Sequence, residues 1–241
     1  MVVNALVYHP SVKHYLSFVA TTVGRDKLLR TIQYFARFYA WYLLRTNATK
    51  AQIAPWDVTK KQFGLARKIL RVGKNVEHLK AAVETADNPK PIDAFLRYAG
   101  IGRQIGYAGY LTFDSAALPD AAGIKKWDKA KTVQAYGYRF WAMGLLFSIS
   151  AQLYTLYQLK QREAKIDRKD GEGVINSKHI ARERAASQLQ LISDLCDLTV
   201  PSSALGWAGF DDGFVGLAGT LSSLIGVYNQ WKKVTAKPAS Q

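Results

Sequence analysis

The sequence predicts an all-α integral membrane protein with an N-terminal amphipathic helical region and a C-terminal two-span helical hairpin. Three observations lead to this prediction. Apolar residues recur at helical spacing through the first half of the 241-residue chain. One predicted helix has a continuous apolar edge opposite a basic edge. Two later stretches, of 20 and 19 residues, carry no charged side chain.

These features divide the chain into five regions. Each region is defined by its charge and by the helix that it is expected to form. They are a basic cytosolic helical region at 1–132 that includes an amphipathic helix at 57–86, a first transmembrane helix at 133–159, a charged inter-span loop or helix at 160–205, a second transmembrane helix at 206–231, and a short basic cytosolic tail at 232–241.

The helices of the first region are predicted from apolar periodicity and from end signals. A first helix covers about 24–46, with aromatic residues spreading around its side. Pro55 marks a break, and Asp57 is a suitable N-cap for a second helix that ends before residue 89, a proline. Segment 92–112 is apolar but contains four glycines, so we expect a weak helix packed on protein or on the membrane.

The second helix has an apolar stripe with the spacing i, i+4, i+7, i+11, i+14, i+18. We predict that its members insert into the membrane: Leu65, Ile69, Val72, Val76, Leu79 and Val83. Residues 65–83 carry five Lys or Arg and one acid, and four on the opposite arc are predicted to bind lipid headgroups: Arg67, Lys68, Arg71 and Lys74. Basic amphipathic helices of this kind lie in the plane of a membrane interface. The alternative is a surface helix whose stripe packs on the first helix.

Two uncharged stretches are long enough to cross a bilayer. They are 140–159 and 213–231, and a helix of 20 residues spans ~30 Å. Tyr and Trp residues near their ends resemble interfacial aromatic belts. Residues 1–139 hold 22 Lys or Arg against 9 Asp or Glu, and residues 160–212 hold 8 against 9, which favours both termini in the cytosol. The alternative is a pair of buried core helices.

Both predicted spans carry small residues on one face. The face of the first comprises Gly144, Ser148 and Ala151, and the face of the second comprises Gly216, Gly219, Ser223 and Gly226. Small side chains let helix backbones approach closely inside lipid. We therefore predict that these faces pack against each other or between subunits. The alternative is that glycine is merely frequent in membrane helices.

The composition favours a polyanionic partner and provides no recognisable catalytic site. The net charge of +15 suits an anionic phospholipid membrane, and no nucleic-acid-binding signature is present. The glycines of 100–106 follow no βαβ pattern and lack the Lys-Ser/Thr of a P-loop. Asp211-Asp212 is interpreted as a turn. The possible metal ligands are scattered: His9, His14, His78, His179 and the single Cys196. We expect no enzyme activity, no cofactor and no metal.

Residues near both ends of the chain resemble one protein family. Gly24-Arg25-Asp26-Lys27, followed by Leu28-Leu29-Arg30 and Gln33-Tyr34-Phe35, resembles the N-terminal signature of the peroxisomal biogenesis factor 11 (peroxin) family, particularly of its fungal members. Asp212-Gly213-Phe214-Val215-Gly216-Leu217 and the terminal Trp231-Lys232-Lys233 resemble the end of that family's sequences. The resemblance covers nearly the whole chain.

The resemblance implies a multi-pass peroxisomal membrane protein with both termini in the cytosol. It also implies a role in peroxisome biogenesis, self-association as a homo-oligomer, and recruitment of a dynamin-like GTPase and a fission adaptor. We therefore predict a peroxisome proliferation and division factor that inserts its amphipathic helix to curve and elongate the membrane. The alternative is a non-selective small-metabolite channel, for which the spans offer few polar lining groups: Gln152, Gln158 and Asn229. A third possibility, a soluble basic adaptor protein, would require that neither 140–159 nor 213–231 crosses the membrane.

Overall fold

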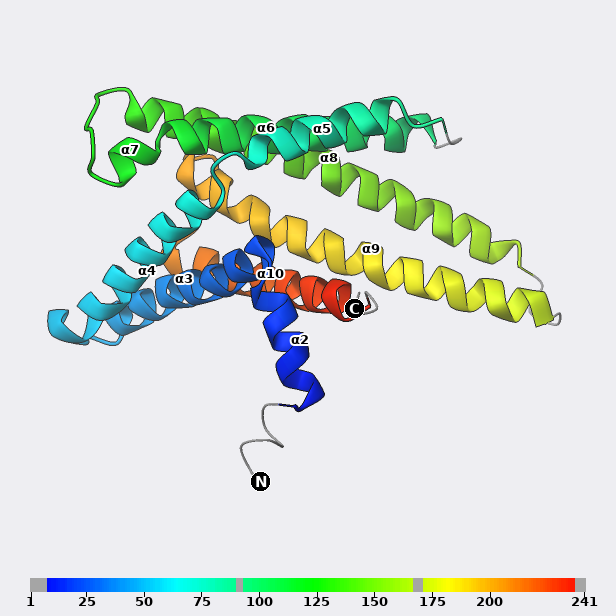
Figure 1. Cartoon of the computed structure of the whole chain (residues 1–241), viewed down its shortest axis with the longest axis horizontal. Coiled ribbons are helices and arrows are strands. Elements are labelled where there is room, and N and C mark those ends of the chain that lie inside the picture. The colour runs from blue at the N-terminus through cyan, green and yellow to red at the C-terminus, as the bar shows by residue number, and fades with distance from the viewer. Residues whose placement is uncertain (1–7, 90–92, 167–170, 237–241) are drawn as a thin grey trace. The chain divides into compact units, whose positions relative to one another are not determined.

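The computed structural model describes residues 8–89, 93–166 and 171–236, and every regular element within these ranges is an α-helix (Figure 1). This confirms the all-α class. The helices are α2 (Pro10–Val19), α3 (Thr22–Arg45), α4 (Lys50–Leu70), α5 (Lys74–Ala86), α6 (Ala94–Ala116), α7 (Leu118–Ala121), α8 (Ala130–Ala164), α9 (Gly171–Ala204) and α10 (Asp212–Thr235).

The chain forms two compact units, and their boundaries differ from the predicted regions. Unit 1 consists of Met1–Leu70 together with Phe210–Gln241, and unit 2 consists of Arg71–Gly209. The predicted N-terminal region 1–132 is therefore divided after Leu70, and the last helix belongs with the first ones. The physical reason is that the glycine-rich face of α10 needs a closely fitting partner, which α3 supplies.

Unit 1 is organised around α3, which α2, α4 and α10 all contact. The Thr21 side chain caps α3 by accepting a hydrogen bond from the N–H of Gly24 at 2.9 Å. The start of α10 is tied to α3 by Arg37, whose guanidinium lies 2.6 Å from the carboxylate of Asp212. Asp211 caps α10 by accepting from the N–H of Phe214. Each residue of the Asp211-Asp212 pair thus has a separate structural task.

Unit 2 is organised around α6, against which α5 and α8 pack, while α9 packs on α8 (Figure 1). Asp93 caps α6 and also accepts a hydrogen bond from the hydroxyl of Tyr154 on α8 at 3.0 Å. Where α6 crosses α8, Gly106 faces Gly144, and a Cβ on Gly106 would lie 2.5 Å from the Cα of Gly144. Gly106 therefore allows the backbones of α6 and α8 to approach closely. This packing stabilises α6, which is longer and better packed than the weak helix expected for segment 92–112.

The predicted amphipathic helix at 57–86 is two helices, which corrects the prediction. Pro55 lies inside α4 and does not end it, although an interior proline removes one intrahelical hydrogen bond. The break lies instead at residues 71–73, where Gly73 adopts φ 82°. A side chain at position 73 would meet nothing within 4 Å, so glycine is favoured there for its left-handed backbone and not for space.

The first predicted transmembrane segment, 133–159, lies within α8, whereas the second, 206–231, begins before α10 and ends inside it. In the part of the chain that the structure describes, no helix combines the length and the apolar character needed to cross a membrane, so the spans at 133–159 and 206–231 are not confirmed. The uncharged stretches contain many serines, glycines and glutamines, and absence of charge is a weaker criterion than high hydropathy.

The remaining predicted regions are also redrawn. Segment 160–205, expected as a loop or helix, contains the end of α8 and the whole of α9. The expected basic tail at 232–241 begins inside α10, which extends to Thr235. Residues 237–241 of that tail lie outside the described residues.

Candidate functional site

The helix α5 exposes its apolar side and turns its polar side toward the protein. Val76, Leu79 and Val83 are exposed by 62%, 50% and 59%, and Val72 in the preceding turn is exposed by 54%. We call these four residues the α5 stripe. An α-helix at the surface of a water-soluble protein normally has the opposite orientation, with its apolar stripe against the core.

Polar contacts bind the other side of α5 to α6. The Asn75 amide donates a hydrogen bond to the Thr112 hydroxyl at 3.1 Å. The ring nitrogen Nδ1 of His78 lies 2.7 Å from Oε1 of Gln104, and the same ring stacks on Tyr107 with 5.4 Å between centroids. These contacts fix the rotation of α5 about its axis, so the α5 stripe cannot turn inward without breaking them.

Only part of the predicted insertion face belongs to this helix. Leu65 and Ile69 lie on α4 in unit 1, where Leu65 is half-buried and Ile69 is exposed. Val76, Leu79 and Val83 lie on α5 in unit 2. The six residues therefore do not belong to one helix, because the helical pattern is interrupted between Leu70 and Lys74.

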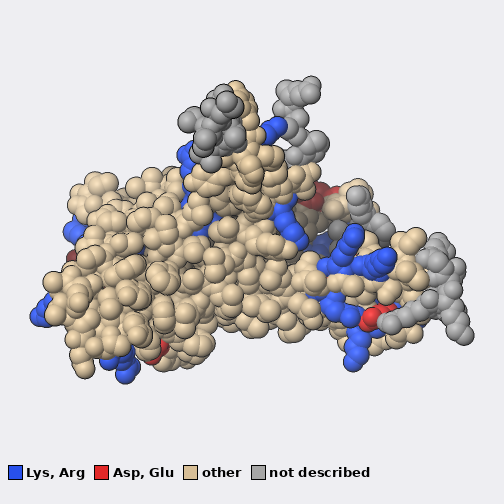
Figure 2. Space-filling model, turned by 90° about the horizontal axis from the view of Figure 1, so that it is seen from below, with Lys and Arg blue, Asp and Glu red and all other residues tan. Residues whose placement is uncertain are grey.

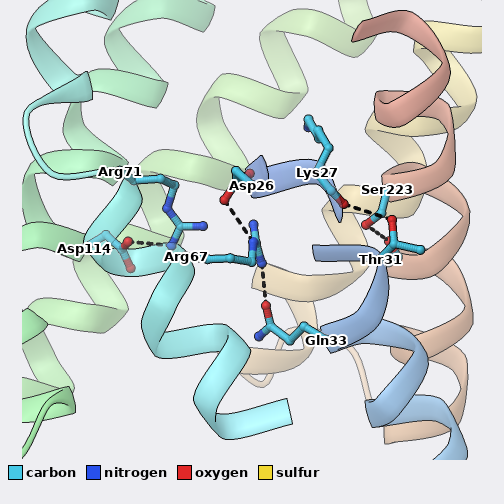
Figure 3. A network of polar contacts seen from close by, with 9 residues as sticks. Asp26, Lys27, Thr31, Gln33, Arg67, Arg71, Asp114 and Ser223 are labelled. Atoms are coloured by element: carbon cyan, nitrogen blue, oxygen red, sulfur yellow. Dashed lines mark hydrogen bonds and ion pairs between the residues drawn. The ribbon is translucent and has the colours of Figure 1, made fainter. Parts of the chain in front are cut away.

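Two of the four predicted headgroup-binding residues are instead engaged inside the protein. Arg67 is 8% exposed and lies 3.0 Å from Asp26, and it donates a second hydrogen bond to the amide oxygen of Gln33. Arg71 lies 2.7 Å from Asp114, which is almost fully buried (Figure 3). Buried carboxylates require such partners. These ion pairs correct the prediction for both arginines.

The other two predicted headgroup ligands lie nearer the surface. Lys68 on α4 and Lys74 at the start of α5 are both half-buried. Lys80, which the sequence analysis did not single out, is exposed on α5, and its side chain is 75% accessible. Cationic side chains beside an apolar stripe suit the boundary between acyl chains and headgroups.

Large apolar side chains are exposed throughout both units. Among the described residues, 35 large hydrophobic side chains are exposed, whereas the core contains 11 buried ones together with eight alanines. On the face seen in Figure 2, most of the visible surface belongs to uncharged residues, and Lys and Arg occur in separate groups. Scattered exposed leucines are ordinary, but contiguous apolar stripes mark interaction surfaces.

A second stripe, on α10, was missed by the sequence analysis. Its members are exposed by about half and follow i, i+3, i+7, i+10 and i+14: Phe214, Leu217, Leu221, Leu224 and Tyr228. This spacing was readable in the sequence. The prediction for segment 213–231 defines an uncharged span with a small-residue face and no separate apolar stripe.

The small-residue faces lie in helix contacts within each unit. On α10, a Cβ at Gly216 would lie 2.5 Å from the backbone nitrogen of Phe38, and one at Gly219 would lie 2.2 Å from the ring of Tyr34. Ser223 is fully buried, and Gly226 faces the side chain of Lys27. The partner of this face is α3. The face was expected to pack on the first predicted span or between subunits.

The small face of α8 has two partners. Gly144 lies against α6, and Ser148 donates a hydrogen bond to Asp194 on α9 at 2.6 Å, while Ala151 is half-buried. Further polar pairs continue along α8 and α9: Ser187 donates to Gln152, Arg162 pairs with Glu183, and Arg184 pairs with Glu163. Polar groups thus lie between these helices, while Leu146 and Leu153 of α8 are exposed.

Asp194 is a buried carboxylate, and burial raises its pKa. Hydrogen bonds from Ser148 and Gln190 and the charge of Arg103 act in the opposite direction, and Asp197 adds a further raising effect. A carboxyl group with a raised folded-state pKa favours folding at low pH. Its contribution is fully present below the unfolded-state pKa and is lost as the pH rises through the folded-state pKa.

At pH values above neutral, we therefore expect the Asp194→Asn variant to have a higher thermal unfolding midpoint than the wild type. The difference between the two midpoints should shrink as the pH falls. An asparagine has nearly the same shape, and the Ser148 hydroxyl can either donate to it or accept from it. Thermal unfolding of the detergent-solubilised protein, followed by circular dichroism at acidic and alkaline pH, measures the effect. A variant that is less stable than the wild type at alkaline pH would contradict this account.

Comparison with known proteins identifies the family of this chain. The fold and the exposed stripes are those of an all-α protein whose helices turn apolar faces outward, as helical proteins that contact lipid do. The chain belongs to the peroxisomal biogenesis factor 11 (PEX11) family, whose family model matches residues 12–231. It is a fungal-type member, and the family is not a known class of enzyme.

The relatives match over almost their whole length. The chain is 28% identical to peroxisomal membrane protein PMP27 of Saccharomyces cerevisiae, an alignment that covers 96% of this chain and 99% of the relative. It is 26% identical to peroxisomal membrane protein PMP30A of Candida boidinii, in an alignment that covers 98% of this chain and 100% of the relative. It is 25% identical to human peroxisomal membrane protein 11C, in an alignment that covers 85% of this chain and 88% of the relative. No solved structure matches the chain.

Proposed function

We propose that this protein is a peroxisomal membrane protein that promotes peroxisome proliferation and division by laying α5 into one leaflet of the membrane. The observation that carries the proposal is the orientation of α5, whose polar side is bound to α6 while the α5 stripe is exposed. Family membership and the names of the relatives support the peroxisomal membrane as the site of action.

The energetics favour insertion of the α5 stripe. Moving a half-exposed valine or leucine out of water contributes about 1 kcal/mol, and the stripe contains four such residues. A lysine close to an anionic leaflet adds about 1 kcal/mol, and Lys74 and Lys80 lie on this helix. A helix held among the headgroups of one leaflet expands that leaflet, and the membrane bends in response.

This proposal is narrower than the sequence-based prediction. The inserting residues are those of the α5 stripe, since Leu65 and Ile69 belong to a different helix. The headgroup contacts are assigned to Lys74 and Lys80, because the side chains of Arg67 and Arg71 are only 9% and 14% exposed and are held in ion pairs. A 13-residue helix is sufficient, because an interfacial helix does not have to cross the bilayer.

The remaining features are inferred from the family resemblance and from the charge distribution. Self-association, recruitment of a dynamin-like GTPase and a fission adaptor, and a multi-pass topology with both termini in the cytosol stay predictions. The channel alternative gains no support. Gln152 accepts a hydrogen bond from Ser187 and Gln158 donates one to Asp93, so these polar groups are engaged within unit 2.

The double substitution Val76→Asp/Leu79→Asp tests the proposal. It should reduce tubulation of anionic vesicles by the reconstituted full-length protein by more than about tenfold, because two carboxylates would have to enter the interface. Electron microscopy measures the tubules. The same variant should leave peroxisomes short when it replaces the wild-type protein in cells.

The matched control is Lys61→Asp, which changes the net charge by the same two units at an exposed position on α4, outside the α5 stripe. The proposal gives Lys61 no contact with lipid. Its replacement should therefore reduce tubulation much less than the double substitution does. Equal tubulation by wild type and by Val76→Asp/Leu79→Asp would refute the proposal.

A further inference from the structure

The connection between α7 and α8 exposes apolar and basic side chains together. We call residues 124–131, which run from this connection into the first residues of α8, the basic loop. Ile124 is exposed by 80% and Trp127 by 39%. The lysines of the loop are all exposed: Lys125, Lys126, Lys129 and Lys131. A single exposed isoleucine is ordinary, but here two large apolar side chains and four lysines are exposed within eight consecutive residues.

The backbone of the basic loop is held in a defined conformation. The N–H groups of Ile124 and Lys125 both donate to the carbonyl oxygen of Pro119, at 2.9 and 3.2 Å. Gly123 provides the required turn with φ 74°, and a side chain there would meet nothing within 4 Å. The Lys126 ammonium donates to the backbone oxygen of Asp120 at 2.7 Å. The exposure of Ile124 is therefore built into the turn.

The charge of the basic loop is strongly positive. Residues 124–131 contain four lysines and one aspartate, a net charge of +3. The nearby Asp120 lies 3.6 Å from Lys126 and offsets only that lysine. Lys125, Lys129 and Lys131 surround Trp127 in the sequence. Trp is the side chain that most favours the boundary between water and acyl chains, because it combines a large apolar ring with an N–H donor.

We propose that the basic loop is a second membrane-contact site, at which Lys125, Lys129 and Lys131 bind the phosphates of anionic phospholipids while Ile124 and Trp127 enter the interface. This inference rests on the proposed function, because it adds an anchor to the same membrane-bound unit that contains α5. A nucleic acid would also match the charge and could stack on Trp127, but it offers no apolar environment for Ile124.

The test places an environment-sensitive nitrobenzoxadiazole label at position 124 of the full-length chain, as Ile124→Cys in a Cys196→Ala background. The protein is reconstituted into vesicles of phosphatidylcholine with or without phosphatidylserine. In vesicles that contain phosphatidylserine, the emission should shift to shorter wavelength and be quenched by phospholipids brominated on the acyl chains. In phosphatidylcholine alone, both effects should be much smaller.

Charge-removing variants then separate this site from general electrostatics. Each lysine near an anionic surface strengthens binding to that surface by about fivefold. Removing three of them in Lys125→Gln/Lys129→Gln/Lys131→Gln should therefore abolish the phosphatidylserine-dependent shift. The matched control Lys50→Gln/Lys61→Gln/Lys233→Gln removes three exposed lysines elsewhere and should leave the shift unchanged. An equal shift in both kinds of vesicle, no shift in either, or a shift produced by heparin but not by vesicles would overturn the proposal.

The label and the tubulation assay distinguish the two proposals. If position 124 stays in water while tubulation still depends on the α5 stripe, the basic-loop proposal fails alone. If position 124 enters the membrane while Val76→Asp/Leu79→Asp tubulates normally, the proposed function of α5 fails alone.

Discussion

Replacing Gly216 by leucine should destabilise unit 1 by about 3 kcal/mol or more. A Cβ at Gly216 would lie 2.5 Å from the backbone nitrogen and 2.7 Å from the Cα of Phe38. Backbone atoms in the middle of α3 cannot yield as a flexible side chain can. The helices α10 and α3 would therefore have to separate.

The expected result is a decrease of roughly 6–12 °C in the thermal unfolding midpoint of the detergent-solubilised protein. Gly216→Ala should have a smaller effect in the same direction, which keeps the prediction testable if the leucine variant does not fold. The control is Gly209→Leu, where a Cβ would meet nothing within 4 Å. If Gly216→Leu unfolds at the wild-type temperature, the packing of α10 on α3 is not as described.

Replacing Arg71 by alanine should destabilise unit 2 by about 3–5 kcal/mol, because it removes a guanidinium that pairs with the buried Asp114 carboxylate. Asp114 is 3% exposed, and the ion pair has an N–O distance of 2.7 Å. The guanidinium also lies 5.7 Å from the ring centre of Tyr110, so its packing is lost as well. Denaturant unfolding followed by circular dichroism measures the change.

The double variant Arg71→Leu/Asp114→Leu should recover much of the lost stability, because it removes both charges and leaves none buried alone. Lys80→Ala provides the control, since it removes a lysine from an exposed pair and should change the free energy of unfolding by less than about 0.5 kcal/mol. If Arg71→Ala and Lys80→Ala had equal effects, the Arg71–Asp114 pair would not be the structural link inferred here.

The helices of this protein could be predicted from apolar periodicity, but the places where they end could not. The first predicted helix, 24–46, corresponds to α3 at Thr22–Arg45. The second predicted helix, 57–86, continues through Gly73. One glycine inside a helix costs only about 1 kcal/mol, and the apolar spacing is the same on both sides of it. Pro55 lies inside α4 without ending it, whereas Gly73 lies at the break between α4 and α5.

The two sides of α5 were identified from the sequence, but their orientation was open. An apolar stripe and a polar arc are visible in Val76, Leu79, Asn75 and His78. Only three-dimensional structure shows which side meets the protein, because the partners of the polar arc, Thr112 and Gln104 among them, lie more than 25 residues away. Such long-range pairs leave no local signal.

The interior polar contacts explain why charge alone was a poor guide to the membrane-facing surface. Asp194 and the glutamine and serine partners along α8 and α9 lie between helices, while leucines on α8 are exposed. An uncharged stretch was interpreted as a span because it lacks Lys, Arg, Asp and Glu. Its serines and glutamines, which mark the polar contacts, were the signal that pointed to helix packing.

The central claim is that the α5 stripe meets lipid, and a nitroxide scan of α5 tests it most directly. Single spin labels are placed at Val76, Leu79 and Val83 and at the off-stripe positions Glu77, Lys80 and Glu84 of the reconstituted full-length protein. We predict that oxygen, which concentrates among acyl chains, relaxes the stripe labels more than a water-soluble nickel complex does, and that the off-stripe labels show the reverse. Equal access of the nickel complex to both sets of labels would contradict the account.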